Sequence, residues 1–377
     1  MSDNKLRSTE RLRDALNAAI IVFFSGILLT FLTLMLFNTG YGIKTRDDFF
    51  DGQEHDGLFF MSLSEIFYKN VEINNNVSEF EFMLFSKVNS DKVILGNNGY
   101  LFEMKNDSTG YNFWKDCSGA LSFTKQESDA IASAIKSATE YYSSMGIDYY
   151  VAVIPNSQTV YHEELPKEIL PQTSPSRRLS LLTALESNGI KNYIDTTINL
   201  EKHSKNYILF NNTENSPTPL GAFFAYSEIC KHLESNGHSL ITISEDSLRY
   251  QVHLTKSRAL AKQAGVSEHI ENVTVSLTSE MKKYFVASEN GNAIITRSTL
   301  YPVGSSGPRA IISTSSENDS SAFTFFFASS FGECMTESTS SISEELLRDF
   351  SAEIYIQIIY ENELGRISEL VTPKTGK

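Results

Sequence analysis

Two serines stand where a hydrolase could place its nucleophile. Ser329 and Ser330 follow the apolar run FTFFFA (323–328) and precede the small residue Gly332. The run predicts a buried strand that ends in a sharp turn, and such a turn presents the nucleophilic serine in many hydrolases. A serine hydroxyl becomes a good nucleophile only beside a base, usually a histidine that a carboxylate orients.

The base would have to come from elsewhere in the chain. His162 follows one predicted strand and His203 precedes another, so either histidine could reach a site at the edge of a sheet. Ser330 also has a structural interpretation, because a small residue suits a sharp turn and a serine there caps the helix that follows. The fold decides between these two roles.

The elements around these residues alternate between strand and helix. The dipeptide Asn98-Gly99 inside VILGNNGYLFEM (93–104) predicts a β-hairpin. Thr124 and Glu127 form a predicted capping box for a helix that ends at Gly146. Further predicted strands lie at 148–155, 192–195, 310–313, 323–328 and 353–360, and further helices at 176–189, 220–237 and 343–350.

This order predicts an α/β fold with a mostly parallel sheet and helices on both faces. Ligands of such sheets bind beyond the carboxyl ends of the strands, so the loops at 155–162, 211–219 and 329–334 are the predicted site. Residues 238–308 fit the alternation less well and could form an insertion or a subdomain.

The N-terminal region predicts a membrane anchor. Residues 15–37 hold no charged residue and are long enough to cross a bilayer as a helix. No clear cleavage site follows them, so an uncleaved anchor is expected and a cleaved signal is the alternative. Cations are more frequent before this segment than after it, which places residues 1–14 in the cytoplasm. Residues 38–60 then form a polar stalk, and residues 61–377 form an extracytoplasmic domain.

Composition narrows the chemistry further. The formal net charge of -14 and the lack of a Lys/Arg cluster after residue 50 argue against nucleic acid as a partner. The sequence has no Cys/His cluster with metal spacing and no phosphate-binding glycine loop, so we expect no metal and no cofactor. Cys117, Cys230 and Cys334 allow at most one disulfide, and buried free thiols are the expectation.

Several stretches, in this order, resemble the alginate O-acetyltransferase-like proteins, the AlgX and AlgJ group of SGNH-hydrolase-like domains. VILGNNGYLFEM resembles their opening hairpin, and VAVIPNSQTVYHEELP (151–166) resembles their "viPnKxxvYpexLP" segment. LFNNTENSPTPLGAFFAY (209–226) resembles "LYyktDTHWnxxGAyxaY", FFFASSFGE resembles the nucleophile block "vfgDSFg", and TKSRALAKQAGV (255–266) more distantly resembles "GDLAxmlgl". The resemblance implies an SGNH-hydrolase-like fold.

The resemblance also implies acetyl transfer onto extracellular polysaccharides by a Ser-His-Asp set. The family's nucleophile position is Ser330, with Ser329 where the family has Asp. Ser216 stands at the histidine position, and its hydroxyl cannot accept a proton at useful rates because its pKa lies far above neutrality. The family's Asp, Thr, His and Trp positions are held here by Glu214, Asn215, Ser216 and Pro217.

The segment at 151–166 implies a substrate groove. Its expected lining residues are Asn156, Ser157 and Tyr161, with Ser157 at the position of the family's lysine. Four aromatic residues could stack on sugar rings there or pack into the core. They are Tyr100, Phe102, Phe113 and Trp114.

Three functional hypotheses follow. The first is a catalytically degenerate, membrane-anchored binder or partner in exopolysaccharide or cell-surface glycan assembly. The second is an active O-acetyltransferase or acetylesterase in which Ser330 uses a relocated base, with His162 the first candidate. The third is a scaffold for a membrane acyltransferase that hands acetyl groups outward.

Overall fold

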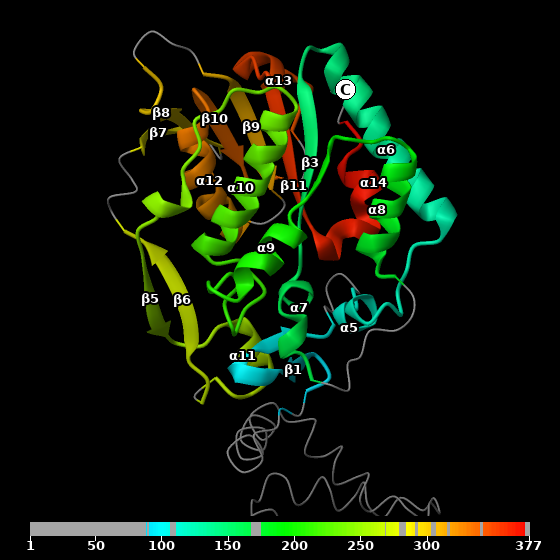
Figure 1. Ribbon diagram of the computed structural model, residues 1–377, viewed down its shortest axis with the longest axis vertical. Helices are drawn as coiled ribbons and strands as arrows, with labels where there is room; N and C mark the ends of the chain where they lie inside the picture. Colours follow the sequence, from blue (N-terminus) through cyan, green and yellow to red (C-terminus); the bar gives the residue numbers. More distant parts are fainter. Residues whose placement is uncertain are drawn as a thin grey trace, which may run out of the picture. The chain divides into compact units, whose positions relative to one another are not determined.

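A mixed β-sheet forms the centre of the domain, in the strand order β4-β3-β11-β9-β10-β8-β7 (Figure 1). In this computed structural model, the described residues are 88, 90–105, 111–166, 175–267, 269–278, 284–290, 293–302, 307–314, 317–339 and 342–373. The strands of this sheet are β3 Asp148–Ile154, β4 Tyr193–Asp195, β7 Phe285–Asn290, β8 Ala293–Ser298, β9 Arg309–Thr314, β10 Glu333–Glu337 and β11 Ile354–Tyr360.

The strands from β4 to β10 run parallel to one another, whereas β8 and β7 are antiparallel additions at the far edge. Helices cover both faces (Figure 1). The predicted α/β class, with a mostly parallel sheet and helices on both faces, is therefore confirmed. The helices are α5 Phe113–Cys117, α6 Lys125–Ser144, α7 Ser157–Val160, α8 Arg177–Ser187, α9 Thr197–Ser204, α10 Pro219–Ser235, α11 Ala259–Gln263, α12 Glu317–Ser330, α13 Glu344–Phe350 and α14 Ile367–Leu370.

The sheet separates two hydrophobic cores. In β3, Tyr150 and Ala152 pack with α9, α10 and α12 on one face, and Tyr149 and Val151 pack with α6, α8, α13 and α14 on the other. Successive strand residues point to opposite faces, so a strand that is buried on both faces must be apolar throughout. This is why DYYVAVI reads as a continuous apolar run.

Local signals in the sequence located several elements correctly. Strands β1 (Val93–Leu95) and β2 (Leu101–Glu103) form the predicted antiparallel hairpin, and Asn98 and Gly99 both have positive φ. Thr124 and Glu127 form the predicted capping box of α6.

The apolar run FTFFFA is helical, so its prediction as a strand is wrong. It lies within α12, where Phe323, Phe326 and Phe327 are fully buried and the ring of Phe326 packs against Phe223 of α10. A short apolar run does not distinguish a buried strand from a buried helix, because both are apolar all round. The strand of this region is β10, at Glu333–Glu337, which the sequence did not predict.

The middle segment at 238–308 contributes to two sheets. Strands β5 (Tyr250–Thr255) and β6 (Asn272–Leu277) form a separate antiparallel pair, whereas β8 joins the central sheet beside β10. The segment therefore contains a small sheet of its own, and part of it extends the main fold.

The predicted N-terminal tail, anchor and stalk at 1–14, 15–37 and 38–60 lie outside the described residues. Within the part of the chain that the structure describes, no helix is long and apolar enough to cross a membrane. All three cysteines are free thiols; Cys230 and Cys334 are buried and Cys117 is part-buried.

Gly221 allows the loop before α10 to pack closely on the first turn of that helix. A Cβ atom at this position would lie 2.1 Å from the carbonyl oxygen of Leu209, which also accepts a hydrogen bond from the backbone of Thr218. We expect Gly221→Ala to lower the free energy of unfolding by roughly 1–3 kcal/mol through overpacking, measured by urea denaturation. Lys231→Ala, at an exposed position of the same helix, should stay within about 0.5 kcal/mol of the native protein. An equally stable Gly221→Ala variant would contradict this packing.

Candidate functional site

The carboxyl edge of the parallel strands carries the candidate site. Helix α7 follows β3 at this edge (Figure 1). Glu361 also lies there, because it is the first residue after β11. The loop at 211–217 leads into α10 and hydrogen-bonds to α7 through Asn215. The predicted loops at 155–162 and 211–219 are therefore brought together.

Ser330 lies at the opposite edge of the sheet, so the placement of 329–334 at the carboxyl edge is wrong. Strand β9 runs parallel to β10, and α12 must return between them from the carboxyl edge to the amino edge. Ser330 is the last residue of α12. It ends a helix, whereas the sequence analysis placed it before one.

The side chain of Ser330 is also inaccessible. Its exposed fraction is 0%, its hydroxyl hydrogen-bonds to the hydroxyl of Tyr226, and its carbonyl accepts a hydrogen bond from Tyr301 at 2.7 Å. Ser329 is equally buried, and its hydroxyl donates to the carbonyl of Phe326 at 2.7 Å. Neither hydroxyl can meet an external substrate in this arrangement.

A strand-to-helix junction of the kind that presents a nucleophile does lie at the carboxyl edge. Strand β9 ends at Thr314 and α12 begins at Glu317. The two residues between them are Ser315 and Ser316, which lie outside the described residues. FFFASSFGE begins in the last part of α12, so it is not a strand-to-helix turn.

His162 and His203 are the two proposed bases, and within the described part of the chain no histidine hydrogen-bonds to Ser330. His162 lies in the short turn after α7 and is exposed. The ring of His203 stacks on Phe224 with centroids 3.9 Å apart, and burial lowers its pKa. Because α7 follows a strand at the carboxyl edge, His162 and Ser330 lie at opposite ends of the sheet.

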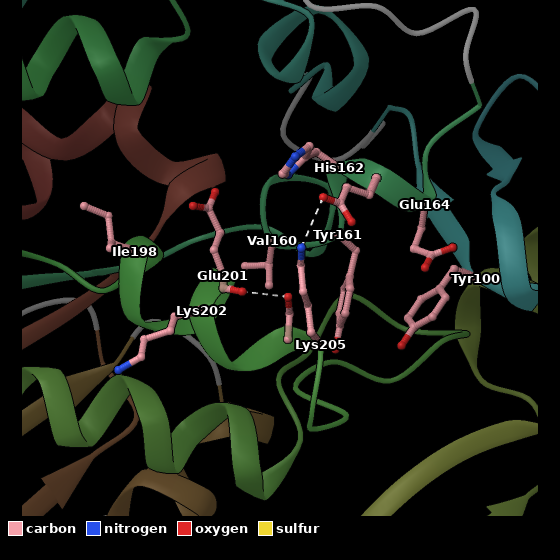
Figure 2. A pocket seen from close by; sticks show the side chains of 11 residues that line it. Tyr100, Val160, Tyr161, His162, Glu164, Ile198, Glu201, Lys202 and Lys205 are labelled. Carbon is pink, nitrogen blue, oxygen red and sulfur yellow. Dashed lines mark hydrogen bonds and ion pairs between the residues drawn. The ribbon is translucent and has the colours of Figure 1, made fainter.

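His162 lines a pocket of about 500 Å³ between the β1–β2 hairpin, α7 and α9 (Figure 2). Lys205 pairs with Glu163 at its rim at 3.6 Å. Glu164 accepts hydrogen bonds from Asn98, so the hairpin and the turn after α7 are joined there. The pocket is lined by Tyr100, Val160, Tyr161, His162, Glu163, Glu164, Ile198, Glu201, Lys202, Ser204 and Lys205.

The predicted groove residues divide between this pocket and the core. Tyr161 lines the pocket with little exposed surface, and its hydroxyl accepts a hydrogen bond from the backbone of Leu209 at 2.9 Å. Ser157 is buried and Asn156 is part-buried. Among the four aromatic candidates, Phe102 and Phe113 are buried, whereas Tyr100 and Trp114 are part-buried.

Asn215, which lies between the family's Asp and His positions, and Ser157, at its lysine position, belong to a polar network. The Ser157 hydroxyl donates to the Asn215 side-chain oxygen at 3.2 Å, and the Asn215 amide donates to the Glu103 carboxylate at 2.5 Å. The Gln158 amide also donates to the Glu103 carbonyl, at 2.6 Å. Ser216 accepts a long hydrogen bond of 3.4 Å from Asn211. This arrangement connects α7, β2 and the 211–217 loop.

Two further loop residues, which the sequence analysis did not single out, attach the loop to its other neighbours. The Asn212 amide donates to the carbonyls of Gly99 and Glu271, and its side-chain oxygen accepts from Val273 at 2.7 Å. The buried Thr213 hydroxyl donates to the Asn272 side chain at 2.8 Å and accepts from the Arg258 backbone at 2.9 Å.

A buried charged group lies directly after β11. The Glu361 carboxylate accepts hydrogen bonds from the Asn156 backbone at 2.8 Å and the Thr159 hydroxyl at 2.7 Å, which fixes α7. Arg178 pairs with Asp195 at 2.5 Å and lies 3.9 Å from Glu361. Burial raises the pKa of Glu361 to about 7. Its position immediately after a predicted strand was the one signal in the sequence that could have indicated it.

No group of three or more His, Cys, Asp or Glu side chains among the described residues could hold a metal ion. Glu361 accepts hydrogen bonds from the Asn156 backbone and the Thr159 hydroxyl, and Asp195 pairs with Arg178.

The fold and its carboxyl edge define an SGNH-hydrolase-like α/β domain. The sequence profile described as "SGNH hydrolase-like domain, acetyltransferase AlgX" matches residues 93–299, more than half of the chain. The chain therefore belongs to this AlgX/AlgJ-type O-acetyltransferase-like family, as the resemblance implied. The match includes the 211–217 loop and ends before β9. No curated protein sequence matches the chain.

Solved structures share the fold at low sequence identity. A DHHW family protein from Eubacterium siraeum is 13% identical with a TM-score of 0.51, covering 76% of this chain and 99% of its own. Bacillus cereus PatB1 with a sulfonyl adduct is 11% identical with a TM-score of 0.50, covering 73% and 97%. The O-acetyltransferase domain of Pseudomonas putida AlgJ is 14% identical with a TM-score of 0.46, covering 74% and 98%.

The Thr213 hydroxyl should contribute measurably to stability. Thr213→Val keeps the shape of the side chain but leaves the Asn272 side chain and the Arg258 backbone without this partner. We expect the free energy of unfolding to fall by roughly 1–3 kcal/mol, measured by urea denaturation. Glu214→Gln, a neighbouring substitution that keeps the size of the side chain, should change it by less than about 0.5 kcal/mol. Equal stability of the two variants would show that the hydrogen bonds of the Thr213 hydroxyl do not stabilise the fold.

Glu361 should make stability depend on pH. The pKa of Glu361 is about 7 in the folded protein, against an ordinary glutamate value of 4.5 that applies to the unfolded chain. The folded state therefore binds this proton more tightly than the unfolded chain does. The free energy of unfolding should therefore fall between about pH 4.5 and pH 7, by on the order of 3 kcal/mol relative to Glu361→Gln. Urea denaturation across this range measures the difference. Glu369→Gln, at an exposed site, should show the same pH dependence of the free energy of unfolding as the native protein. If the free energies of the native protein and Glu361→Gln differed by the same amount at every pH, the raised pKa of Glu361 would be contradicted.

Proposed function

We propose that this protein is a catalytically degenerate member of the AlgX/AlgJ-type family that acts in O-acetylation or assembly of an exopolysaccharide or cell-surface glycan as a binder or partner. The single observation that carries the proposal is the 211–217 loop. The family's histidine position is Ser216, and the neighbouring Asn215 is held between Ser157 and Glu103.

The chemistry of the loop supports loss of catalysis. A general base for acyl transfer must accept a proton near neutral pH, and neither a serine hydroxyl nor an asparagine amide can do so. Glu214 could orient a histidine, but position 216 offers none. The amide and hydroxyl groups of this loop are hydrogen-bonded within the protein, so a binding role would use the pocket beside His162.

The alternative of an active acetyltransferase or acetylesterase that uses Ser330 lacks geometric support. Ser330 is fully buried against Tyr226, and its proposed base His162 lies beyond the other end of the sheet. A shift of the base cannot bring these two side chains within hydrogen-bond reach, because the length of the strands separates them.

The pocket beside His162 supports a glycan as the ligand. Its free polar groups include His162 and Glu201, which can hydrogen-bond sugar hydroxyls, and Tyr100 contributes an aromatic wall (Figure 2). The predicted anchor at 15–37 would hold the domain at the outer face of the cell membrane with residues 1–14 in the cytoplasm. In that location a membrane acyltransferase is a second possible partner.

Acetyl-ester turnover tests the loss of catalysis. The full-length protein should not hydrolyse or transfer acetyl from a chromogenic acetyl ester above the level of its Ser330→Ala variant, because Ser330 is buried and has no base. A Ser315→Ala/Ser316→Ala variant, measured in parallel, examines the serines at the β9–α12 junction. Turnover that either variant abolishes would contradict the loss of catalysis.

Affinity electrophoresis in polysaccharide-containing gels tests the binding role. His162→Ala and Glu201→Ala should weaken retention of the protein in the gel, and Lys191→Ala should not.

A further inference from the structure

Strand β5 presents three large apolar side chains to solvent. Tyr250, Val252 and Leu254 are 38%, 51% and 64% exposed, and alternate residues of a strand share one face. Scattered single apolar residues are normal on a protein surface, but a contiguous row of them marks an interaction site. This row is named the β5 face below.

The β5 face is the exposed part of an apolar surface that continues onto the partly buried strand β6. Its residues lie opposite Leu277, Val275 and Val273 of β6 in the antiparallel register. Val275 is buried, and Leu277 packs against the same hydrophobic core. Strand β6 therefore covers part of the core, whereas β5 extends away from the central sheet (Figure 1) and has β6 as its partner strand in the described part of the chain.

Cations accompany the β5 face. The stretch RYQVHLTKSRALAKQAGV (249–266) contains four Lys or Arg residues and no Asp or Glu, although the whole chain has a net charge of -14. Lys256, Arg258 and Lys262 are exposed, and none of these three pairs with a carboxylate of the described residues. Exposed cations without partners in an acidic protein favour an anionic ligand.

We propose that the β5 face, together with Lys256, Arg258 and Lys262, docks onto the surface of an anionic lipid bilayer. Apolar side chains can enter the boundary between headgroups and acyl chains while the cations attract anionic headgroups, and tyrosine is favoured at that depth. Val252 and Leu254 have no group that could hydrogen-bond a sugar, so a glycan does not explain the row. The inference does not depend on the proposed function.

The docking surface is connected to the candidate site. The Arg258 backbone donates to Thr213, and the Asn212 side chain binds the backbone of β6 at Val273. A bilayer that holds β5 would therefore also fix the orientation of the 211–217 loop. The edge strand β7 of the central sheet offers a matched reference position, because Val286 on this strand is 66% exposed.

An environment-sensitive label distinguishes docking from general membrane attachment. Full-length Val252→Cys protein, labelled with a nitrobenzoxadiazole fluorophore, is mixed with phosphatidylglycerol-containing vesicles or with pure phosphatidylcholine vesicles. We expect a blue shift and increased emission only with anionic vesicles, reversed at high salt because salt screens exposed charges. The label at Val286→Cys should not respond, and Lys256→Glu/Arg258→Glu should abolish the response at position 252.

Three outcomes of the vesicle experiment would overturn the inference. They are no spectral change with anionic vesicles, an equal change at positions 252 and 286, and a change that does not depend on anionic lipid. A response at position 252 that requires an added polypeptide would also overturn it, in favour of strand addition to β5.

Discussion

Asn212 and Thr213 in the loop at 211–217 are buried, and their side chains form hydrogen bonds within the protein that hold much of the surrounding structure. The buried Asn211 side-chain oxygen is the exception, since it has no hydrogen-bond partner in the described part of the chain. A buried donor or acceptor without a partner costs free energy comparable to a lost hydrogen bond or more. Asn212 therefore binds the β1–β2 hairpin and β6, Thr213 binds β6 and the start of α11, and Asn215 binds α7 and β2. These hydrogen bonds connect the loop to segments that are far apart in the sequence.

The same constraint bears on chemistry. A catalytic loop keeps reactive groups available to a substrate, whereas these amide and hydroxyl groups are used within the protein. Glu361 acts similarly on the other side of α7, where its carboxylate binds the Asn156 backbone and the Thr159 hydroxyl. Helix α7 is thus hydrogen-bonded to Glu361 on one side and, through Ser157 and Gln158, to Asn215 and Glu103 on the other. The side chains of Asn212, Thr213 and Asn215 at the carboxyl edge therefore all have hydrogen-bond partners within the protein.

The sequence predicted those elements whose signals are local. The hairpin at Asn98-Gly99 and the capping box of α6 each depend on residues a few positions apart. The run FTFFFA carried no such signal, because burial makes helices and strands equally apolar, and the error moved Ser330 to the wrong edge of the sheet. Glu361 and Thr213 could not be predicted as structural residues, since their partners are distant in sequence and only the folded chain brings them together.

The central claim is that the domain has no activated serine. The most direct measurement is reaction of the full-length protein with a fluorophosphonate, which modifies nucleophilic serines, followed by intact-protein mass spectrometry. We expect no increase in the mass of the protein under conditions that fully label an active serine hydrolase measured in parallel. A stoichiometric adduct that peptide mapping places on Ser330, or on Ser315 or Ser316, would contradict it.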